Sequence, residues 1–273
     1  MKIVIPMAGI GERFVKAGYT DPKPLIKVNE KLIIEYIVEM FDTENDEFIF
    51  VINQQHAANT NMVEILNTLV KKSEIYIIEN HKKGPVYTLK NLGLDDNEEV
   101  IVTYCDNPYI WDYNKFKEEV KNSDGCILSH SGFHPHRLSS TFMAHIKEIN
   151  GKLIEIKEKE PYTSNPIEEH ASTGTYYFAK GKYIKKYFKE LMDLDINYNG
   201  EYYVTLAYNL MVRDGLDVTI YDTDYVSVFG TPEEVQNFEA WQTILKSGVN
   251  TNEELIASYR YWQIYNEKFD KLK

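Results

Sequence analysis

The residues best suited to chemistry stand near the start of the chain, directly after the apolar run Ile3-Val4-Ile5. Gly9 and Gly11 allow a tight turn in which backbone N–H groups can approach an anion. Arg13 adds a planar positive charge that suits phosphate, and Lys23 adds a compact charge between two prolines that restrict the backbone around it. These residue types at this spacing indicate a loop that binds a triphosphate.

An ordered series of strands and helices must position this loop. The run before it is too short for a helix and predicts a strand buried on both faces. Further strands are expected at residues 47–52, 75–78 and 99–104, and helices at 31–41, 60–72 and 84–92. This alternation predicts a parallel, doubly wound α/β sheet, in which ligands bind at the carboxyl ends of the strands.

The pattern changes after about residue 124. Strands are expected at residues 125–130, 142–149, 153–159, 171–178, 218–221 and 225–229, and helices at 182–192 and 201–212. Asn150-Gly151 is a strong signal for a β-hairpin between two of these strands. Thr231 followed by Pro232 predicts a helix start, and a last helix is expected at 251–271.

A carboxylate follows the strand expected at residues 99–104. Asp106 would lie at the same edge of the sheet as the phosphate loop. Mg²⁺ binds hard oxygen ligands and bridges substrate phosphates. The position of Asp106 therefore suits a magnesium ligand.

The overall composition limits the partners. The formal net charge of −12 over 273 residues argues against a nucleic-acid backbone or an anionic membrane as the main partner. The two cysteines, Cys105 and Cys126, together with the lack of a signal peptide or an apolar span, lead us to expect a cytoplasmic protein with reduced thiols.

The combination Met7-Ala8-Gly9-x-Gly11-x-Arg13, then Pro22-Lys23-Pro24-Leu25, resembles the N-terminal signature of the sugar-phosphate nucleotidyltransferases, or nucleoside-diphosphate-sugar pyrophosphorylases. Later segments resemble the family in the same order to about residue 235. The resemblance implies a Rossmann-like, doubly wound mixed sheet with a small β-rich sugar-binding lobe. We expect a nucleotidyltransferase domain at residues 1–247, with a nucleotide-binding half at about 1–123 and an acceptor-binding half at about 124–247. The helix expected near the end of the chain follows as a C-terminal helix at 248–273.

The resemblance also implies a reaction. A nucleoside triphosphate would be joined to a sugar or polyol phosphate with Mg²⁺, releasing pyrophosphate and giving a nucleotide sugar for surface or capsule polysaccharide. Arg13, Lys23 and Asp106 would be catalytic, with Asp106 as metal ligand. Met7, Ala8, Gly9, Gly11, Glu79 and Gly84 would bind the nucleotide, and Lys159, Gly174 and Glu201 would bind the acceptor.

The residue at position 79 bears on the choice of base. Members that transfer thymidylyl groups use an amide here, whereas Glu79 can only accept hydrogen bonds when ionised. It would suit the amino group of cytosine or the N1 and N2 donors of guanine, which slightly favours CTP. An exposed glutamate at a strand end explains it equally well.

Two positions leave alternatives open. The family usually has a second metal-binding aspartate where this chain has Val228, so either one aspartate suffices or an acid such as Asp222 or Asp224 substitutes. Lys157 competes with Lys159 for the acceptor's phosphate, because residues two apart on a strand share a face.

Two other classes of function fit parts of the sequence. One is a glycosyltransferase of related fold that consumes a nucleotide sugar, against which the pair Arg13 and Lys23 argues. The other is a non-catalytic nucleotide- or sugar-binding regulator, which Val228 keeps open. The apolar stripe of the last predicted helix could pack on its own domain or on a second subunit, so a homo-oligomer also stays open.

Overall fold

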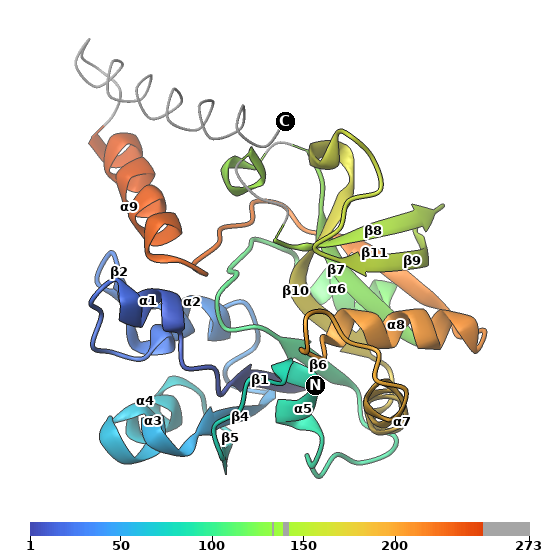
Figure 1. Cartoon of the computed structure of the whole chain (residues 1–273), viewed down its shortest axis with the longest axis horizontal. Helices are drawn as coiled ribbons and strands as arrows, with labels where there is room; N and C mark the ends of the chain where they lie inside the picture. Colours follow the sequence, from blue (N-terminus) through green and yellow to red (C-terminus); the bar gives the residue numbers. More distant parts are fainter. Residues whose placement is uncertain (133, 139–141, 248–273) are drawn as a thin grey trace.

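The computed structural model describes residues 1–132, 134–138 and 142–247. Its strands are β1 (Lys2–Met7), β2 (Lys27–Val28), β3 (Lys31–Leu32), β4 (Glu47–Asn53), β5 (Ser73–Ile78), β6 (Val100–Thr103), β7 (Gly125–His130), β8 (Ala144–Ile149), β9 (Lys152–Glu158), β10 (His170–Phe178) and β11 (Val218–Asp222). Nine of these form one sheet in the order β5-β4-β1-β6-β10-β7-β11-β9-β8, while β2 and β3 form a separate pair within the described residues (Figure 1).

The helices alternate with the strands through the first half of the chain. They are α1 (Glu12–Lys16), α2 (Ile33–Val38), α3 (Gln54–Asn59), α4 (Met62–Leu69), α5 (Gly84–Leu89), α6 (Tyr113–Glu119), α7 (Gly181–Asp193), α8 (Val204–Arg213) and α9 (Pro232–Ser247). Short 3-10 turns lie at Lys23–Leu25, Pro135–Leu138 and Pro166–Glu168.

The central strands are apolar on both faces because helices cover both. On β1, Ile3 and Ile5 belong to a core that includes residues of α2, α4 and α6, whereas Val4 belongs to a second core with residues of α5, α7 and α8. Strands β5, β4, β1 and β6 are parallel. The predicted α/β class with a doubly wound mixed sheet is therefore confirmed.

Strand β10 interrupts the parallel arrangement. It runs antiparallel to both β6 and β7, and its register with β7 shifts between Ser172 and Tyr176. Gly174 lies inside this shift with φ +87°, a conformation that favours glycine.

The predicted hairpin is present at the end of the sheet. Asn150 and Gly151 both have positive φ and join β8 to β9. This hairpin and the adjoining end of β10 are the β-rich part of the second half of the chain (Figure 1).

Several predicted boundaries were wrong. Residues 225–229 form no strand, and Val226 makes only an isolated bridge to Tyr109. The helix expected from residue 201 begins at Val204, so Glu201 precedes it. The helices expected at 31–41, 60–72 and 84–92 are shorter, since β3 occupies the start of the first and loops occupy the ends of the others. The predicted helix at 251–271 lies outside the described residues.

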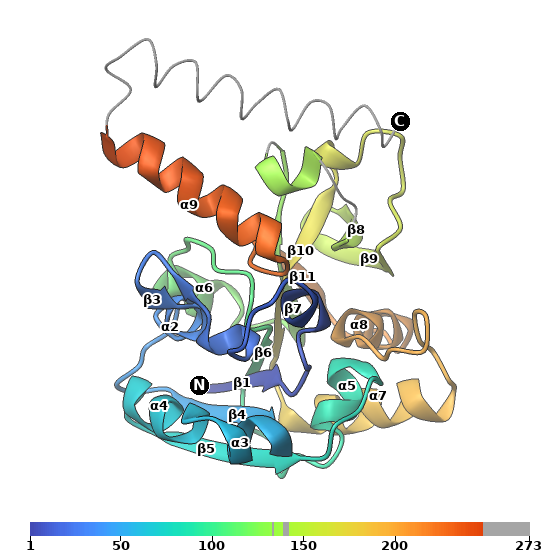
Figure 2. The same ribbon diagram turned by 60° about the vertical axis from the view of Figure 1, so that its left-hand side comes forward.

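Helix α9 packs against the N-terminal part of the chain (Figure 2). Phe229 and Val235, at its start, share a small core with Phe14 of α1. Asn29 binds Glu239 and Gln242 with its backbone and side-chain nitrogens at 3.0 and 2.8 Å. The threonine cap predicted for this helix is confirmed, since Thr231 Oγ1 accepts from the N–H of Glu234 at 3.2 Å. These contacts bring the first turn of α9 to the predicted phosphate loop.

Candidate active site

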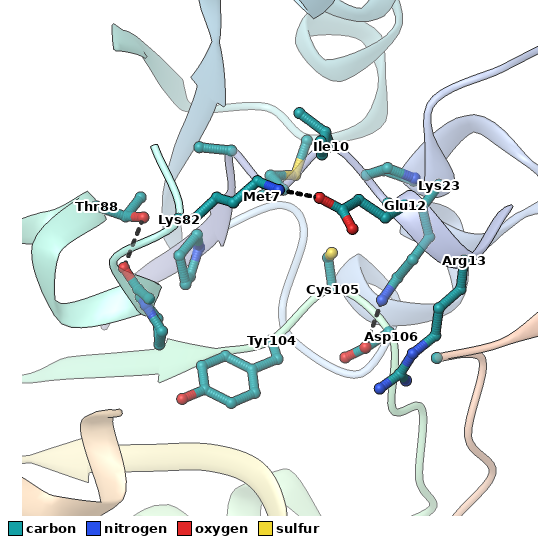
Figure 3. Close-up of a pocket in the computed structure, with 18 of the residues that line it drawn as sticks. Met7, Ile10, Glu12, Arg13, Lys23, Lys82, Thr88, Tyr104, Cys105 and Asp106 are labelled. Carbon is teal, nitrogen blue, oxygen red and sulfur yellow. Dashed lines mark hydrogen bonds and ion pairs between the residues drawn. The ribbon is translucent and has the colours of Figure 1, made fainter. Parts of the chain in front are cut away.

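A cavity of about 620 Å³ lies where the carboxyl ends of β1 and β6 meet (Figure 3). Its walls are the loop after β1, the residues after β6, the loop before α5 and the segment before α8. The lining residues include Met7, Ala8, Gly9, Gly11, Arg13, Lys23, Gly84, Asp106 and Glu201. Nine of the twelve residues predicted for the site thus come together here.

The loop after β1 is fixed by its own backbone and by a buried amide. Gly11 has φ +65°, and its carbonyl accepts from the N–H groups of Phe14 and Val15 at 2.9 and 3.2 Å. The fully buried side chain of Asn53 donates to the carbonyl of Ala8 at 3.0 Å. Hydrogen bonds within the protein therefore fix the shape of the loop.

Lys23 and Asp106 form an ion pair within the cavity (Figure 3). Lys23 starts the 3-10 turn that follows Pro22, and Asp106 follows β6. Burial alone would lower the pKa of Lys23, but the charge of Asp106 and the hydrogen bond to it, together with contributions from Cys105 and Glu234, raise it overall. Lys23 therefore presents a fixed positive charge to the cavity at neutral pH.

Further cations surround the mouth of the cavity. Arg13, Lys16 and Lys82 line it together with Lys23, although the whole chain is acidic. Lys82 pairs with Glu12 across the opening (Figure 3), and the guanidinium of Arg13 lies 5.3 Å from the centre of the exposed Phe142 ring. This local positive field suits a polyanion such as a triphosphate.

The thiol beside Asp106 is not suited to nucleophilic chemistry. Burial raises the pKa of Cys105 to about 11, although Lys23 acts in the opposite direction. The thiol is therefore protonated at neutral pH.

The loop before α5 is docked on the segment before α8. Gly84 has φ +81°, and a Cβ there would lie 2.8 Å from the backbone N and O of Tyr202. The carbonyl of Tyr202 accepts from Val86 N–H at 3.1 Å, and Tyr202 N–H donates to Lys83 at 3.0 Å. Gly84 thus permits a close approach that closes one side of the cavity.

Glu79, which we predicted to read the base, lies in a cavity adjacent to the main one. Glu79 lines a second cavity of about 350 Å³ that shares His81 and Thr88 with the first. His81 Nδ1 accepts from Lys83 N–H at 3.1 Å, and its Nε2 lies 3.2 Å from Thr88 Oγ1. Burial lowers the pKa of His81, so its ring is a neutral wall between the cavities.

Two of the three residues predicted to bind the acceptor, Lys159 and Glu201, are linked through Tyr203. Lys159 donates to the hydroxyl of Tyr203 at 2.6 Å, and that hydroxyl donates to the carboxylate of Glu201. Tyr203 and Glu201 line the main cavity, whereas Lys159 stands behind them. Burial, followed by the bond to Glu201, raises the pKa of Tyr203, so its hydroxyl keeps its proton.

The competitor Lys157 points elsewhere. It pairs with Glu160 at 3.4 Å and lies 4.8 Å from the ring centre of Tyr162. Strand β9 ends at Glu158, and Lys159 has φ +59°, which breaks the alternation of the strand. The expectation that Lys157 and Lys159 share a face was therefore wrong.

Gly174 contacts Tyr104, one of the residues that line the cavity. Its carbonyl accepts from Tyr104 N–H at 2.9 Å, and a Cβ there would lie 3.0 Å from the Tyr104 ring and 3.1 Å from the amide of Asn107. Tyr104 itself lines the cavity. The glycine thus lets the segment after β6 lie close against β10.

The cavity residues fit a magnesium ion. Asp106 offers a carboxylate beside the phosphate loop, and the missing side chain of Gly230 leaves space next to it, since a Cβ there would lie 3.7 Å from Asp106 Oδ2. Of the two substitutes considered for Val228, Asp222 instead binds Ser129 and His170 at 2.5 and 2.9 Å. Asp224 is exposed and does not line this cavity.

Sequence reasoning missed several residues of the site. Lys16, Lys82, Tyr104 and Tyr203 line the cavity, and Asn53 holds the loop. The pair Lys82-Lys83 before Gly84 could have indicated further phosphate-binding cations, because it again places positive charges beside a glycine, as in the loop after β1. Nothing local marked Tyr203 or Asn53, since their roles depend on contacts between distant segments.

Comparisons with known proteins give the family of this chain. A family model described as nucleotidyl transferase matches residues 2–208. A search of curated proteins found no significant match.

Solved structures share the fold. A nucleoside-diphosphate-sugar pyrophosphorylase from Vibrio cholerae RC9 is 24% identical, with 87% of this chain and 99% of that chain covered and a TM-score of 0.70. A putative glucose-1-phosphate thymidylyltransferase from Bacillus anthracis is 20% identical, with coverage of 93% and 98% and a TM-score of 0.67. The inositol-1-phosphate CTP transferase from T. maritima is 12% identical, with coverage of 92% and 98% and a TM-score of 0.65. On the strength of the match over residues 2–208, the chain belongs to the nucleotidyl transferase family.

Proposed function

We propose that this protein joins a nucleoside triphosphate to a sugar or polyol phosphate, with release of pyrophosphate. The observation that carries the proposal is the arrangement of the cavity. Lys23 and Asp106 share one cavity with the cationic phosphate loop and with Glu201 and Tyr203, which are hydrogen-bonded in a chain to Lys159. A triphosphate and a phosphorylated acceptor could therefore meet at the ion pair.

The roles of the phosphate-side residues follow from charge and position. Backbone N–H groups around Gly9 and Gly11, with Arg13, hold the β- and γ-phosphates. Lys23 stabilises the charge that grows on the α-phosphate as the acceptor's phosphate oxygen attacks it. Asp106 would hold Mg²⁺, which supplies charge neutralisation on the phosphates. The acceptor phosphate is already a nucleophile at neutral pH, so no general base is required.

The acceptor side supplies complementary contacts. The ammonium of Lys159 donates to the hydroxyl of Tyr203 and lies 4.5 and 5.4 Å from the ring centres of Tyr203 and Tyr198. In this proposal it turns from these aromatic groups toward an acceptor phosphate. Glu201 accepts hydrogen bonds, which suits the hydroxyls of a sugar or polyol. Gly174 lets Tyr104, which lines the cavity, lie close against β10.

CTP is the nucleotide that we favour. Glu79 offers only acceptor oxygens when ionised, and the loop that it begins leads to Gly84, the first residue of α5, at the wall of the main cavity. The nucleotide sugar or polyol would serve the synthesis of surface or capsule polysaccharide in the cytoplasm. The two free, buried cysteines suit a reducing compartment, and no described helix combines the length and apolarity needed to cross a membrane.

Pyrophosphate release tests the proposal. The protein is incubated with Mg²⁺, a pool of sugar and polyol phosphates, and CTP, UTP, dTTP, GTP or ATP in turn. Release with CTP supports both the reaction and the role of Glu79, and release with UTP or dTTP alone keeps the reaction but removes that role. Binding of nucleotide without any release would contradict the reaction and favour a regulator. Consumption of a nucleotide sugar instead would favour a glycosyltransferase.

A further inference from the structure

A buried carboxylate oxygen near Asp106 lacks a hydrogen-bond partner among the described residues. It is Oε2 of Glu234, in the first turn of α9. A buried carboxylate oxygen without a donor is costly, because it has lost its water without replacement. This cost calls for an explanation in the chemistry of the site.

Gly230 shows where this oxygen lies. A Cβ at position 230 would stand 3.2 Å from Glu234 Oε2, 3.7 Å from Asp106 Oδ2 and 3.8 Å from Cγ1 of Val228. All three atoms therefore flank the small space that the absence of a side chain at Gly230 leaves open. Gly230 and Asp106 both line the main cavity, so this space adjoins it.

The helix cap accounts for only part of Glu234. Its backbone N–H donates to Thr231 Oγ1, and its carboxylate interacts with the hydroxyl and backbone N–H of Thr231, as in a capping box. The cap does not use Oε2, which is the atom that faces Asp106.

The surroundings hold Glu234 in place. Phe229 and Val235, which flank residues 230–234, are buried in the core shared with Phe14. Glu239 and Gln242 of α9 accept hydrogen bonds from Asn29. The negative charge of Glu234 also acts on Lys23, which now occupies the position beside Asp106. A cation therefore already lies in the field of both carboxylates.

We propose that Glu234 is the second carboxylate of the magnesium site, in place of the aspartate that is missing at Val228. This inference rests on the proposed function. Mg²⁺ in nucleotide sites is bound by one or two carboxylates, with waters and substrate phosphates completing its shell. No described group of three or more histidine, cysteine, aspartate or glutamate residues could hold a metal, and a site of two carboxylates does not require one.

The test measures metal binding itself. Mn²⁺ binding is followed by electron paramagnetic resonance, with the protein alone and with the nucleoside triphosphate that supports turnover. Glu234→Gln removes the charge but keeps the cap, because glutamine also serves at this position of a capping box. Glu233→Gln on the exposed neighbour is the matched control. Asp106→Asn reports whether the metal binds at the proposed site at all.

We expect Glu234→Gln to weaken Mn²⁺ binding by at least about tenfold, because even residues that only orient metal ligands contribute that much to metal affinity. The melting temperature should not change. Glu233→Gln should bind as wild type. The double variant Val228→Asp/Glu234→Gln should recover affinity, because position 228 flanks the same space.

Each other outcome has a distinct meaning. Wild-type Mn²⁺ affinity in Glu234→Gln, alongside a loss in Asp106→Asn, would overturn the role of Glu234 and leave the proposed function standing. No effect of Asp106→Asn would instead contradict the metal site of the proposed function. A loss of stability in Glu234→Gln without weaker Mn²⁺ binding would show that Glu234 serves the cap alone.

Discussion

Lys23 is the single residue through which the proposed chemistry can be tested most simply. Its charge is directed into the cavity by Asp106, where it would meet the α-phosphate. We expect Lys23→Ala to lower kcat by about 100- to 1,000-fold, the effect of losing a preorganised group that stabilises transition-state charge. Lys27→Ala, on an exposed position of β2, should retain wild-type turnover. Turnover near wild type in Lys23→Ala, with an unchanged circular dichroism spectrum, would refute this role.

Lys159 and Lys157 give a matched pair on the acceptor side. Because only Lys159 joins the chain through Tyr203 to Glu201, Lys159→Ala should raise the KM for the phosphorylated acceptor by about tenfold or more, the effect of losing a charged hydrogen bond. The KM for the nucleotide should change little. Lys157→Ala should leave both unchanged, since this lysine pairs with Glu160. Initial rates at varied acceptor concentration check this, and the reverse pattern would assign the acceptor to Lys157.

The sequence could predict residues whose role depends on local chemistry. The glycine turn, Arg13, Lys23 and Asp106 share a cavity because each follows a strand or turn at the same edge of the sheet. It could not place Tyr203 between Lys159 and Glu201, since that contact depends on the packing of α8 against β9. Glu234 was visible only as a helix start, and its orphaned oxygen required coordinates.

At the scale of elements, the loop before α5 depends on one glycine. Gly84→Ala would place a Cβ against the backbone of Tyr202 in a left-handed conformation, so we expect a loss of about 1–3 kcal/mol in the free energy of unfolding. Gly93→Ala is the control, because no atom lies within 4 Å of its added Cβ. Urea denaturation measures both, and equal stability of the two variants would contradict the close approach.

The predicted strands and helices were confirmed where consecutive residues are all buried. Runs such as Phe48 to Ile52 are buried on both faces, and no other element explains them. Helix α3 was missed because none of its residues is buried, so no apolar period marked it. The prediction of a strand at 225–229 was wrong. Phe229 is buried because it packs in the small core with Val235 of α9, and not because the segment pairs with a neighbouring strand.

At the scale of the whole molecule, the predicted nucleotide and acceptor halves share one sheet. Strand β10, from the second half, lies between β6 and β7 and pairs with both. The alternation of strands and helices predicted the parallel part well. The sequence could not reveal that β10 runs back through the sheet, because strand order depends on long-range pairing.

The stability of the protein should depend on pH through the buried carboxyl group of Glu158. Glu158 accepts from the Thr205 hydroxyl at 2.7 Å, and burial raises its pKa to about 7. Because the folded state holds this proton more tightly than the unfolded state does, ionisation should cost stability as the pH rises from about 4.5 to 7. The cost approaches about 3 kcal/mol above pH 7.

Glu158→Gln should remove that decline. Urea unfolding at pH 5 to 8 should show the wild type losing stability relative to this variant as the pH rises. Glu64→Gln, at an exposed position of α4, is the control and should follow the wild type. Parallel pH profiles for wild type and Glu158→Gln would contradict the raised pKa.

In the proposed reaction, a phosphate oxygen of the acceptor attacks the α-phosphorus of the nucleotide. An acceptor whose phosphate carries ¹⁸O in its non-bridging positions tests this directly, with products analysed by mass spectrometry. We expect all of the label to remain in the nucleotide-linked product and the pyrophosphate to be unlabelled. Label in the pyrophosphate, or release of nucleoside monophosphate in its place, would contradict it.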